Sequence, residues 1–367
     1  MSDALWRRAA PLALVFATLL TPPATEAAPP SGPKHQAKHR AKARPSAQAA
    51  AAAYGQRADV VAFAEVQAEG LGLSPDALAQ LLAQARKVPA VQKLIMPPPV
   101  GTAKDWSAYR ARFVEPRRLQ AGLAFWQAHE AALTRAEEQF GVPAEIIAGI
   151  IGVETFYGQI MGGFRVLDAL ATLSFDFPPG RKDRSEFFRS ELIEFLRLTK
   201  REGLDPLAVK GSYAGAIGYG QFMPGSWNRH AVDFDADGRI DLIASPADAI
   251  GSVANFLAQH GWQRGMPTHY SVQLPVDTTA RAALLAPDIT PSFSAAQLAE
   301  RGAQLSEAGQ EHAGLLAVVE LQNGSAAPSY LAGTQNFYTL TRYNWSAYYA
   351  MGVIELGRSL ATLRRAQ

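Results

Sequence analysis

Hydrophobic residues recur at helical spacing over most of the chain from residue 58 onward. Ser74, Pro75 and Asp76 have the order of an N-cap, a first-turn proline and a first-turn acid, which predicts that a helix begins there. A longer apolar stripe predicts one amphipathic helix that ends at Gly141. Its positions are Leu119, Leu123, Trp126, Leu133 and Phe140. Another helix is predicted through 187–196, after the Pro-Gly break that ends at residue 180.

The pattern changes after Trp262. Three short runs, 270–274, 315–321 and 338–342, are typical of strands, and Asn323-Gly324 predicts a turn between the last two. No internal repeat or coiled-coil heptad is visible. The pattern therefore predicts an α+β protein that is mainly helical and carries a small β-sheet insert.

The composition predicts a globular chain of more than one unit. Its 367 residues are 48% hydrophobic and 19% charged, which excludes a mainly disordered protein. A length prior of roughly 150 residues per domain predicts two or three units. The formal net charge of +2 and the absence of nucleic-acid-binding motifs predict that no nucleic acid is bound. The absence of cysteine excludes disulfides, cysteine-ligated metals, a thiol nucleophile and a lipid anchor on an N-terminal cysteine.

The N-terminal residues predict export. Residues 1–27 combine a basic start, an uncharged run too short to span a bilayer, and small residues around the expected cleavage point near Ala27. Residues 28–57 follow as a basic, acid-free segment, which predicts a disordered linker. An alternative is that this segment tethers the chain to an anionic surface such as membrane headgroups or wall polymer. We therefore expect the chain to be exported, with no transmembrane segment.

A lone glutamate stands near the end of a helix that is apolar nearly all round, after Pro143 at its start. Glu145 is expected to be only a first-turn acid, whereas Glu154 is expected to be buried. A buried carboxylate either pairs with a cation, such as Arg165, or has a raised pKa and can act as a general acid. The periodicity leaves both interpretations open. Asp168 and Asp176 could supply a second carboxylate for a glycosidase, but capping or loop roles are favoured for both.

The glycine-rich segment 210–224 does not have the order of a nucleotide-binding loop. Its small residues would let a bulky ligand approach, and Ser212, Tyr219 and Gln221 could hydrogen-bond a sugar. Glycine-rich helix packing is an equally good interpretation.

A second local pattern is typical of a calcium loop. Acids at Asp233, Asp235, Asp237 and Asp241 surround a glycine turn in the order of an EF-hand, but Ala244 stands where the bidentate acid is expected. Asp248 is the nearest replacement, and its alternative role is in a capping box that begins at Ser245. We expect a structural Ca²⁺ ion here and no organic cofactor.

Five ordered segments resemble the lytic murein transglycosylase B family over about residues 58–360. They are GVPAEIIAGIIGVET around Glu154, LDALATLSFDFP at 167–178, KGSYAGAIGYGQFMP at 210–224, DAIGSVANF at 248–256 and NFYTLTRYN at 336–344. The resemblance implies an elongated helical molecule with a goose-type lysozyme-like core. It also implies that Glu154 protonates the glycosidic oxygen between N-acetylmuramic acid and N-acetylglucosamine, and then takes the proton of the muramyl C6 hydroxyl as that hydroxyl closes a 1,6-anhydro ring.

The resemblance also implies two sets of binding residues. The implied substrate-binding residues are Ser212, Gln221, Phe222, Tyr338, Tyr343 and Arg184. The implied calcium ligands are Asp233, Asp235, Asp237, the Arg239 carbonyl and Asp248. The chain departs from the family in three places. The loop before Asp248 is one residue longer, the family's arginine pair is replaced by a stretch that contains Arg181, Lys182 and Arg184, and Phe256 replaces a common tyrosine.

The expected units follow from these segments. They are a signal peptide over 1–27, a linker over 28–57, an N-terminal helical domain over 58–133, a catalytic core with the calcium loop over 134–262, a β-rich domain over 263–335, and a return segment over 336–367 that completes the cleft. The expected partner is the peptidoglycan glycan strand, bound by a monomer that could join a cell-wall enzyme complex. A muramidase that admits water and a non-catalytic peptidoglycan-binding scaffold are the alternative functions.

Overall fold

The computed structural model describes residues 54–97 and 104–367, and the predicted signal peptide lies outside this part of the chain. The helices are α2 Ala58–Leu71, α3 Pro75–Leu82, α4 Pro89–Leu94, α5 Trp106–Ala111, α6 Pro116–Ala128, α7 Glu130–Phe140, α8 Ala144–Thr155, α9 Val166–Phe175, α10 Ser185–Glu202, α11 Pro224–His230, α12 Pro246–Gln259, α13 Thr278–Leu285, α14 Ala295–Glu300, α15 Glu307–Gln310, α16 Gln335–Tyr343 and α17 Ala347–Arg365. The strands are β1 Phe164–Arg165, β2 Lys210–Gly211, β3 His269–Gln273, β4 Gln304–Leu305, β5 Ala317–Asn323 and β6 Ala326–Gly333.

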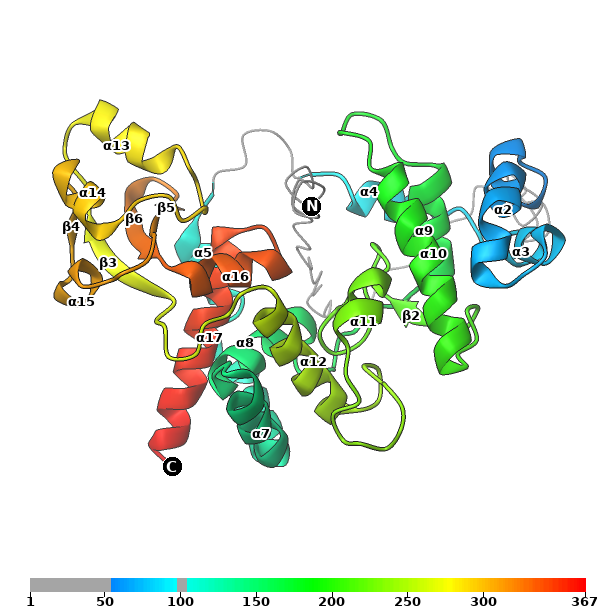
Figure 1. Ribbon diagram of the computed structural model, residues 1–367, viewed down its shortest axis with the longest axis horizontal. Coiled ribbons are helices and arrows are strands. Elements are labelled where there is room, and N and C mark those ends of the chain that lie inside the picture. The colour runs from blue at the N-terminus through cyan, green and yellow to red at the C-terminus, as the bar shows by residue number, and fades with distance from the viewer. Residues whose placement is uncertain (1–53, 98–103) are drawn as a thin grey trace, which may run out of the picture.

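One hydrophobic core joins helices from both ends of the chain, from Tyr54 to Ala361. Helix α2 packs against α10, and α4 packs against α9. Helices α5, α6 and α8 instead pack against the C-terminal helix α17. Figure 1 shows these two groups on opposite sides, with the β-sheet at the end beyond α5 and α16. The segment before α9 thus contributes helices to both groups.

Helix α8 lies against α17 at very short range. A Cβ atom at Gly149 would lie 2.5 Å from the carbonyl oxygen of Val353, and one at Gly357 would lie 2.2 Å from that of Glu145. Glycine is therefore required on both helices at this crossing. The close approach brings side chains of α17 to the last turn of α8.

The β-insert has its own small core and forms a four-stranded antiparallel sheet in the order β4-β3-β6-β5. The predictions for 270–274 and 315–321 are confirmed, and Gly324 has a φ of 63° in the turn between β5 and β6. The prediction for 338–342 was wrong, because these residues lie in α16. Phe337, Leu340 and Thr341 are buried at helical spacing, and the side chain of Thr334 accepts the N–H of Asn336 at the start of the helix.

The predicted helix that ends at Gly141 is divided in two. His129 has φ −122° and ψ 24°, so α6 ends before it and α7 begins after it. Its ring lies 4.7 Å from that of Phe125, which packs at this joint. The predicted end at Gly141 is confirmed, and this glycine adopts the left-handed conformation there.

Residues 54–57, the end of the predicted linker, belong to the folded body. Asp176 receives hydrogen bonds from the Tyr54 hydroxyl at 2.7 Å, Arg57 Nη1 at 2.8 Å and Lys87 Nζ at 2.8 Å. These donors hold the pKa of Asp176 below its usual value although burial opposes them. The carboxylate therefore ties the start of the described chain to the end of α9.

Replacing Asp176 by Ala is expected to lower the free energy of unfolding by about 3 kcal/mol, because it leaves partly buried donors without an acceptor. Urea unfolding measures the change. The matched control is Asp59→Ala, which removes an exposed partner of Arg57 and should cost less than about 1 kcal/mol. If both variants lose the same free energy of unfolding, Asp176 has no stabilising role beyond that of Asp59.

Candidate functional site

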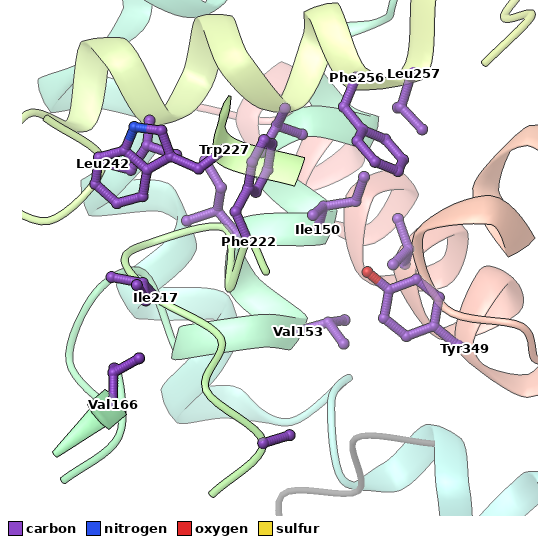
Figure 2. Packing of buried hydrophobic residues seen from close by; sticks show 14 of the residues in the cluster. Ile150, Val153, Val166, Ile217, Phe222, Trp227, Leu242, Phe256, Leu257 and Tyr349 are labelled. Atoms are coloured by element: carbon purple, nitrogen blue, oxygen red, sulfur yellow. The ribbon is translucent and has the colours of Figure 1, made fainter. Parts of the chain in front are cut away.

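Glu154 lies in the last turn of α8, where its side chain is 6% exposed. Ile150, Ile151 and Val153 of the same helix are apolar and buried, and Figure 2 shows Tyr349 of α17 beside Ile150 and Val153. The Tyr349 hydroxyl donates a 2.6 Å hydrogen bond to Glu154 Oε1. Arg165, the cation suggested as a partner, instead pairs with Asp168. Among the described contacts, the Glu154 carboxyl is therefore held by a neutral tyrosine rather than by an ion pair.

This burial changes the proton affinity of the carboxyl. Removal from water raises the pKa of Glu154 to about 7, and the hydrogen bond from Tyr349 offsets part of that rise. The pKa of Tyr349 is raised well above its usual value by burial and by the nearby carboxyl, so the phenol stays protonated as a donor. A carboxyl with a pKa near neutrality can both donate and accept a proton at the same pH.

A second tyrosine joins Glu154 to the glycine-rich segment. The ring of Tyr343 stacks on that of Tyr349, with centroids 6.3 Å apart and planes 11° apart, and its hydroxyl donates to the Gly220 carbonyl at 2.5 Å. Phe222 and Phe256 lie edge-on to the Tyr343 ring at 5.9 Å and 4.9 Å. These contacts place Tyr343 and Phe222 in one cluster with the buried carboxyl. Phe222 is 3% exposed and is a core residue.

Hydrogen bonds from side chains to backbone carbonyls hold the glycine-rich segment next to the end of α8. The hydroxyl of Thr155, which follows Glu154, donates to the Tyr219 carbonyl at 2.8 Å. Gln221 has a φ of 51°, and its Nε2 donates to the carbonyls of Met161 and Gly218. Gln221 Oε1 is buried without a hydrogen-bond partner among the described residues, so it can accept a further bond. The buried Ser212 hydroxyl accepts the Ala216 N–H within the segment itself.

Two predicted substrate residues have other neighbours. Tyr338 lies with Arg342 and Trp345, and its ring centroid is 5.9 Å from that of Trp345. Arg184 precedes α10 and stacks on Phe187, with its guanidinium 4.4 Å from the ring centroid. Burial lowers the pKa of Arg184 to about 10, so it remains a cation. No contact described for Tyr338 or Arg184 reaches Glu154.

The acidic loop brings three of the predicted ligands together. Oxygens of Asp233, Asp235 and Asp248 lie within 4.8 Å of one another. Asp248 reaches into the loop from α12, and its carboxylate accepts the N–H groups of Phe234 and Asp241. The N–H of Asp248 also bonds the Ser245 hydroxyl, so Asp248 serves both the helix start and the loop. This set of hard oxygen donors fits a calcium ion.

The other predicted ligands, Asp237 and Arg239, lie in the same loop. The Asp237 carboxylate accepts the Arg239 N–H at 2.8 Å. Asp237 is not part of the cluster formed by the three other acids.

The candidate second carboxylates are engaged elsewhere. Asp168 pairs with Arg165 and accepts the Arg86 N–H, whereas Asp176 binds the start of the described chain as given above. Sequence reasoning missed Tyr349, and the local signal for it was an aromatic residue in the first turn of a helix whose buried face is apolar. Over residues 54–97 and 104–367, no helix is both long and apolar enough to cross a bilayer.

Known proteins are similar to this chain over most of its length. The Transglycosylase SLT domain matches residues 55–358. Membrane-bound lytic murein transglycosylase B of Escherichia coli is 43% identical over 303 residues, which are 80% of each chain. The structure of the Escherichia coli lytic transglycosylase Slt35 in complex with calcium is 40% identical with a TM-score of 0.74, and the match covers 85% of this chain and 95% of that chain.

A more distant structure is that of SltB3 from Pseudomonas aeruginosa in complex with NAG-anhNAM-pentapeptide. It is 27% identical with a TM-score of 0.67, and the match covers 83% of this chain and 79% of that chain. These neighbours confirm the predicted α+β, mainly helical fold with a lysozyme-like core. The chain is therefore an enzyme that belongs to the lytic murein transglycosylase B family.

Proposed function

We propose that this enzyme cleaves the β-1,4 bond between N-acetylmuramic acid and N-acetylglucosamine in peptidoglycan, with Glu154 as the acid and then the base. The observation that carries the proposal is the Glu154 carboxyl, which has a pKa of about 7 and accepts a hydrogen bond from Tyr349. It lies alone at the apolar end of α8. Protonated Glu154 gives its proton to the glycosidic oxygen as the bond to the muramyl C1 breaks. Asp168 and Asp176 are engaged in ion pairs, which supports a mechanism with a single carboxyl.

The second half of the reaction regenerates the acid. Ionised Glu154 takes the proton of the muramyl C6 hydroxyl, whose oxygen forms a bond to C1, and the product carries a 1,6-anhydro ring. No water is consumed, and the proton lost in the first step returns in the second. The SltB3 complex with NAG-anhNAM-pentapeptide supports this chemistry, because its ligand carries the anhydro sugar.

We infer that the remaining polar residues of this region bind the glycan strand. Gln221 Oε1 is available to accept a bond from a sugar hydroxyl or amide, and Tyr343 presents an aromatic ring beside the carboxyl. Phe222, which packs against Tyr343, and Ser212 would line the groove beside them. Tyr338 and Arg184 complete the proposed set and would contact sugar units farther from the cleaved bond. The complex of SltB3 with NAG-NAM-pentapeptide supports a peptidoglycan fragment as the ligand class.

The test is mass spectrometry of the muropeptides that the enzyme releases from purified sacculi. Products that are one water lighter than reducing-end muropeptides are expected. Reducing-end products would show that water attacks and that the enzyme is a muramidase. Binding to sacculi without any product would favour a non-catalytic scaffold.

We further propose that Asp233, Asp235 and Asp248 hold a structural Ca²⁺ ion, with Asp237 and the Arg239 carbonyl completing its shell. The close acidic oxygens and the calcium complex of Slt35 support this assignment. The ion would neutralise the repulsion between the carboxylates and fix the loop to the start of α12.

Calcium is accordingly expected to raise the melting temperature of chelator-treated enzyme by a few degrees, because a ligand at 100 times its Kd stabilises the native state by about 2.7 kcal/mol. Differential scanning calorimetry measures the shift. Mg²⁺ at the same concentration should give a smaller shift, since it gives up its water reluctantly. Asp235→Asn should reduce the response to calcium. An unchanged melting temperature in the wild type would contradict the assignment.

We also propose that the chain is exported to the periplasm by its N-terminal segment and acts there as a monomer, alone or in a cell-wall enzyme complex. The basic start and the apolar run of residues 1–27 support export. The Escherichia coli relative is described as membrane-bound, whereas this chain contains no cysteine that could carry a lipid. Fractionation that finds the protein in the cytoplasm would refute export.

A further inference from the structure

We infer that Arg118 is a positioning residue for Glu154, acting through the end of helix α8. This inference rests on the proposed acid–base role of Glu154. Arg118 lies in the first turn of α6, and its Nη1 donates to the carbonyl of Gly152, two residues before Glu154. A cation is favourable at a helix C-terminus, where the carbonyl groups have no partner within the helix.

The residues that end α8 have an unfavourable backbone conformation. Phe156 and Tyr157 have φ values of 52° and 59°, and neither is glycine. Such residues cost about 1–3 kcal/mol each and persist only where their surroundings hold them. Their N–H groups bond back to the carbonyls of Gly152 and Ile151, so this strained pair forms the cap that closes the catalytic helix.

Helix α6 holds both cap residues. The guanidinium of Arg118 lies over two aromatic rings, 4.6 Å from the centroid of Phe156 and 5.2 Å from that of Phe113. Tyr157 packs between α6 and α8, because a Cβ atom at Gly122 or at Gly152 would lie within 2.5 Å of its hydroxyl oxygen. The Arg118 side chain therefore contacts the strained residue Phe156 and the carbonyl that Phe156 itself bonds.

The position of Glu154 depends on this cap because the partner of its carboxyl is on another element. Tyr349 belongs to α17, so its 2.6 Å hydrogen bond forms only if the last turn of α8 stays in place. Without Arg118, Phe156 can relax out of the left-handed region, and the turn that carries Glu154 then loses its closing bonds. A displacement of about 1 Å in a reacting group can lower the rate by about a hundredfold.

The test compares Arg118→Met with Arg117→Met, a change at the exposed neighbouring position. With soluble glycan strands as substrate, Arg118→Met is expected to lower kcat roughly tenfold with KM within about twofold, while Arg117→Met leaves both constants unchanged. Arg118→Lys should recover much of kcat, because an ammonium can also donate to the Gly152 carbonyl. Phe156→Gly in the Arg118→Met background should also raise kcat, because glycine adopts positive φ without strain.

A second measurement does not depend on activity. Hydrogen exchange followed by mass spectrometry should show faster exchange in the peptide that contains residues 152–158 for Arg118→Met, but not for Arg117→Met. Unchanged exchange of this peptide in Arg118→Met would overturn the inference. So would kinetics of Arg118→Met in which kcat is unchanged, only KM rises, or kcat falls in proportion to the loss of folded protein. If the wild type itself releases no anhydro product, the proposed function fails, and hydrogen exchange still decides the role of Arg118.

Discussion

Replacing Glu154 by Gln is expected to lower turnover by at least about a thousandfold, because the amide can neither donate nor accept the proton in the proposed reaction. The variant keeps the shape of the side chain and can still accept the hydrogen bond from Tyr349 through its amide oxygen. Binding to isolated glycan strands should stay within about tenfold of the wild type. The release of anhydro-muropeptides, measured by mass spectrometry, gives the rate.

The matched control is Glu145→Gln, a change at a first-turn acid of the same helix. It should retain wild-type turnover. Residual activity of Glu154→Gln near that of the wild type would exclude Glu154 as the acid. Loss of both binding and turnover would instead assign Glu154 a structural role.

The same substitution should stabilise the protein above neutral pH. The pKa of Glu154 is about 7 in the folded state against a usual value of 4.5, so the folded protein holds this proton more tightly than the unfolded chain does. That contribution to stability is present at low pH and is lost as the pH rises through about 7. Glu154→Gln is therefore expected to gain about 3 kcal/mol at pH 8 but less than about 1 kcal/mol at pH 5, relative to the wild type. Urea unfolding at the two pH values measures the difference.

Local patterns predicted the parts of the site whose residues are close in sequence. The acids from Asp233 to Asp248 span sixteen positions, and their alternation around Gly238 is typical of a cation loop before any fold is known. The burial of Glu154 followed in the same way from the apolar residues on every side of its helix. In both cases the signal lies within a short stretch of sequence, although Asp248 reaches the loop from α12 and Glu154 is covered by Tyr349 of α17.

Contacts between distant elements could not be predicted. Tyr349 is 195 positions from Glu154, and their bond depends on the close crossing of α8 and α17 at Gly149 and Gly357. Arg118 reaches the end of α8 only because α6 packs beside it. Residues 338–342 were assigned to a strand because aromatic and β-branched residues suit both structures, and only the buried positions of α16 distinguish them.

Replacing Tyr349 by Phe is expected to lower kcat roughly tenfold to a hundredfold and to move the pH dependence to higher values. The Tyr349 hydroxyl stabilises the ionised form of Glu154, so its loss raises the pKa of Glu154 above about 7. The acid form then persists to higher pH, and the fall of kcat/KM above neutrality shifts upward. A carboxyl with a higher pKa is also a weaker acid, so the transfer of its proton to the glycosidic oxygen in the first step slows.

The neighbouring Tyr348 provides the control for this change. Its hydroxyl accepts the Gln322 N–H at 2.8 Å and has no described contact with Glu154, so Tyr348→Phe should leave the pH profile in place. Phenylalanine fills the space of either tyrosine, and packing is therefore nearly the same in both variants. A shift that appears only in Tyr349→Phe assigns it to the hydrogen bond on the carboxyl. If neither variant shifts the profile, the observed pKa belongs to another group, and Glu154 is not the residue that limits the rate above neutral pH.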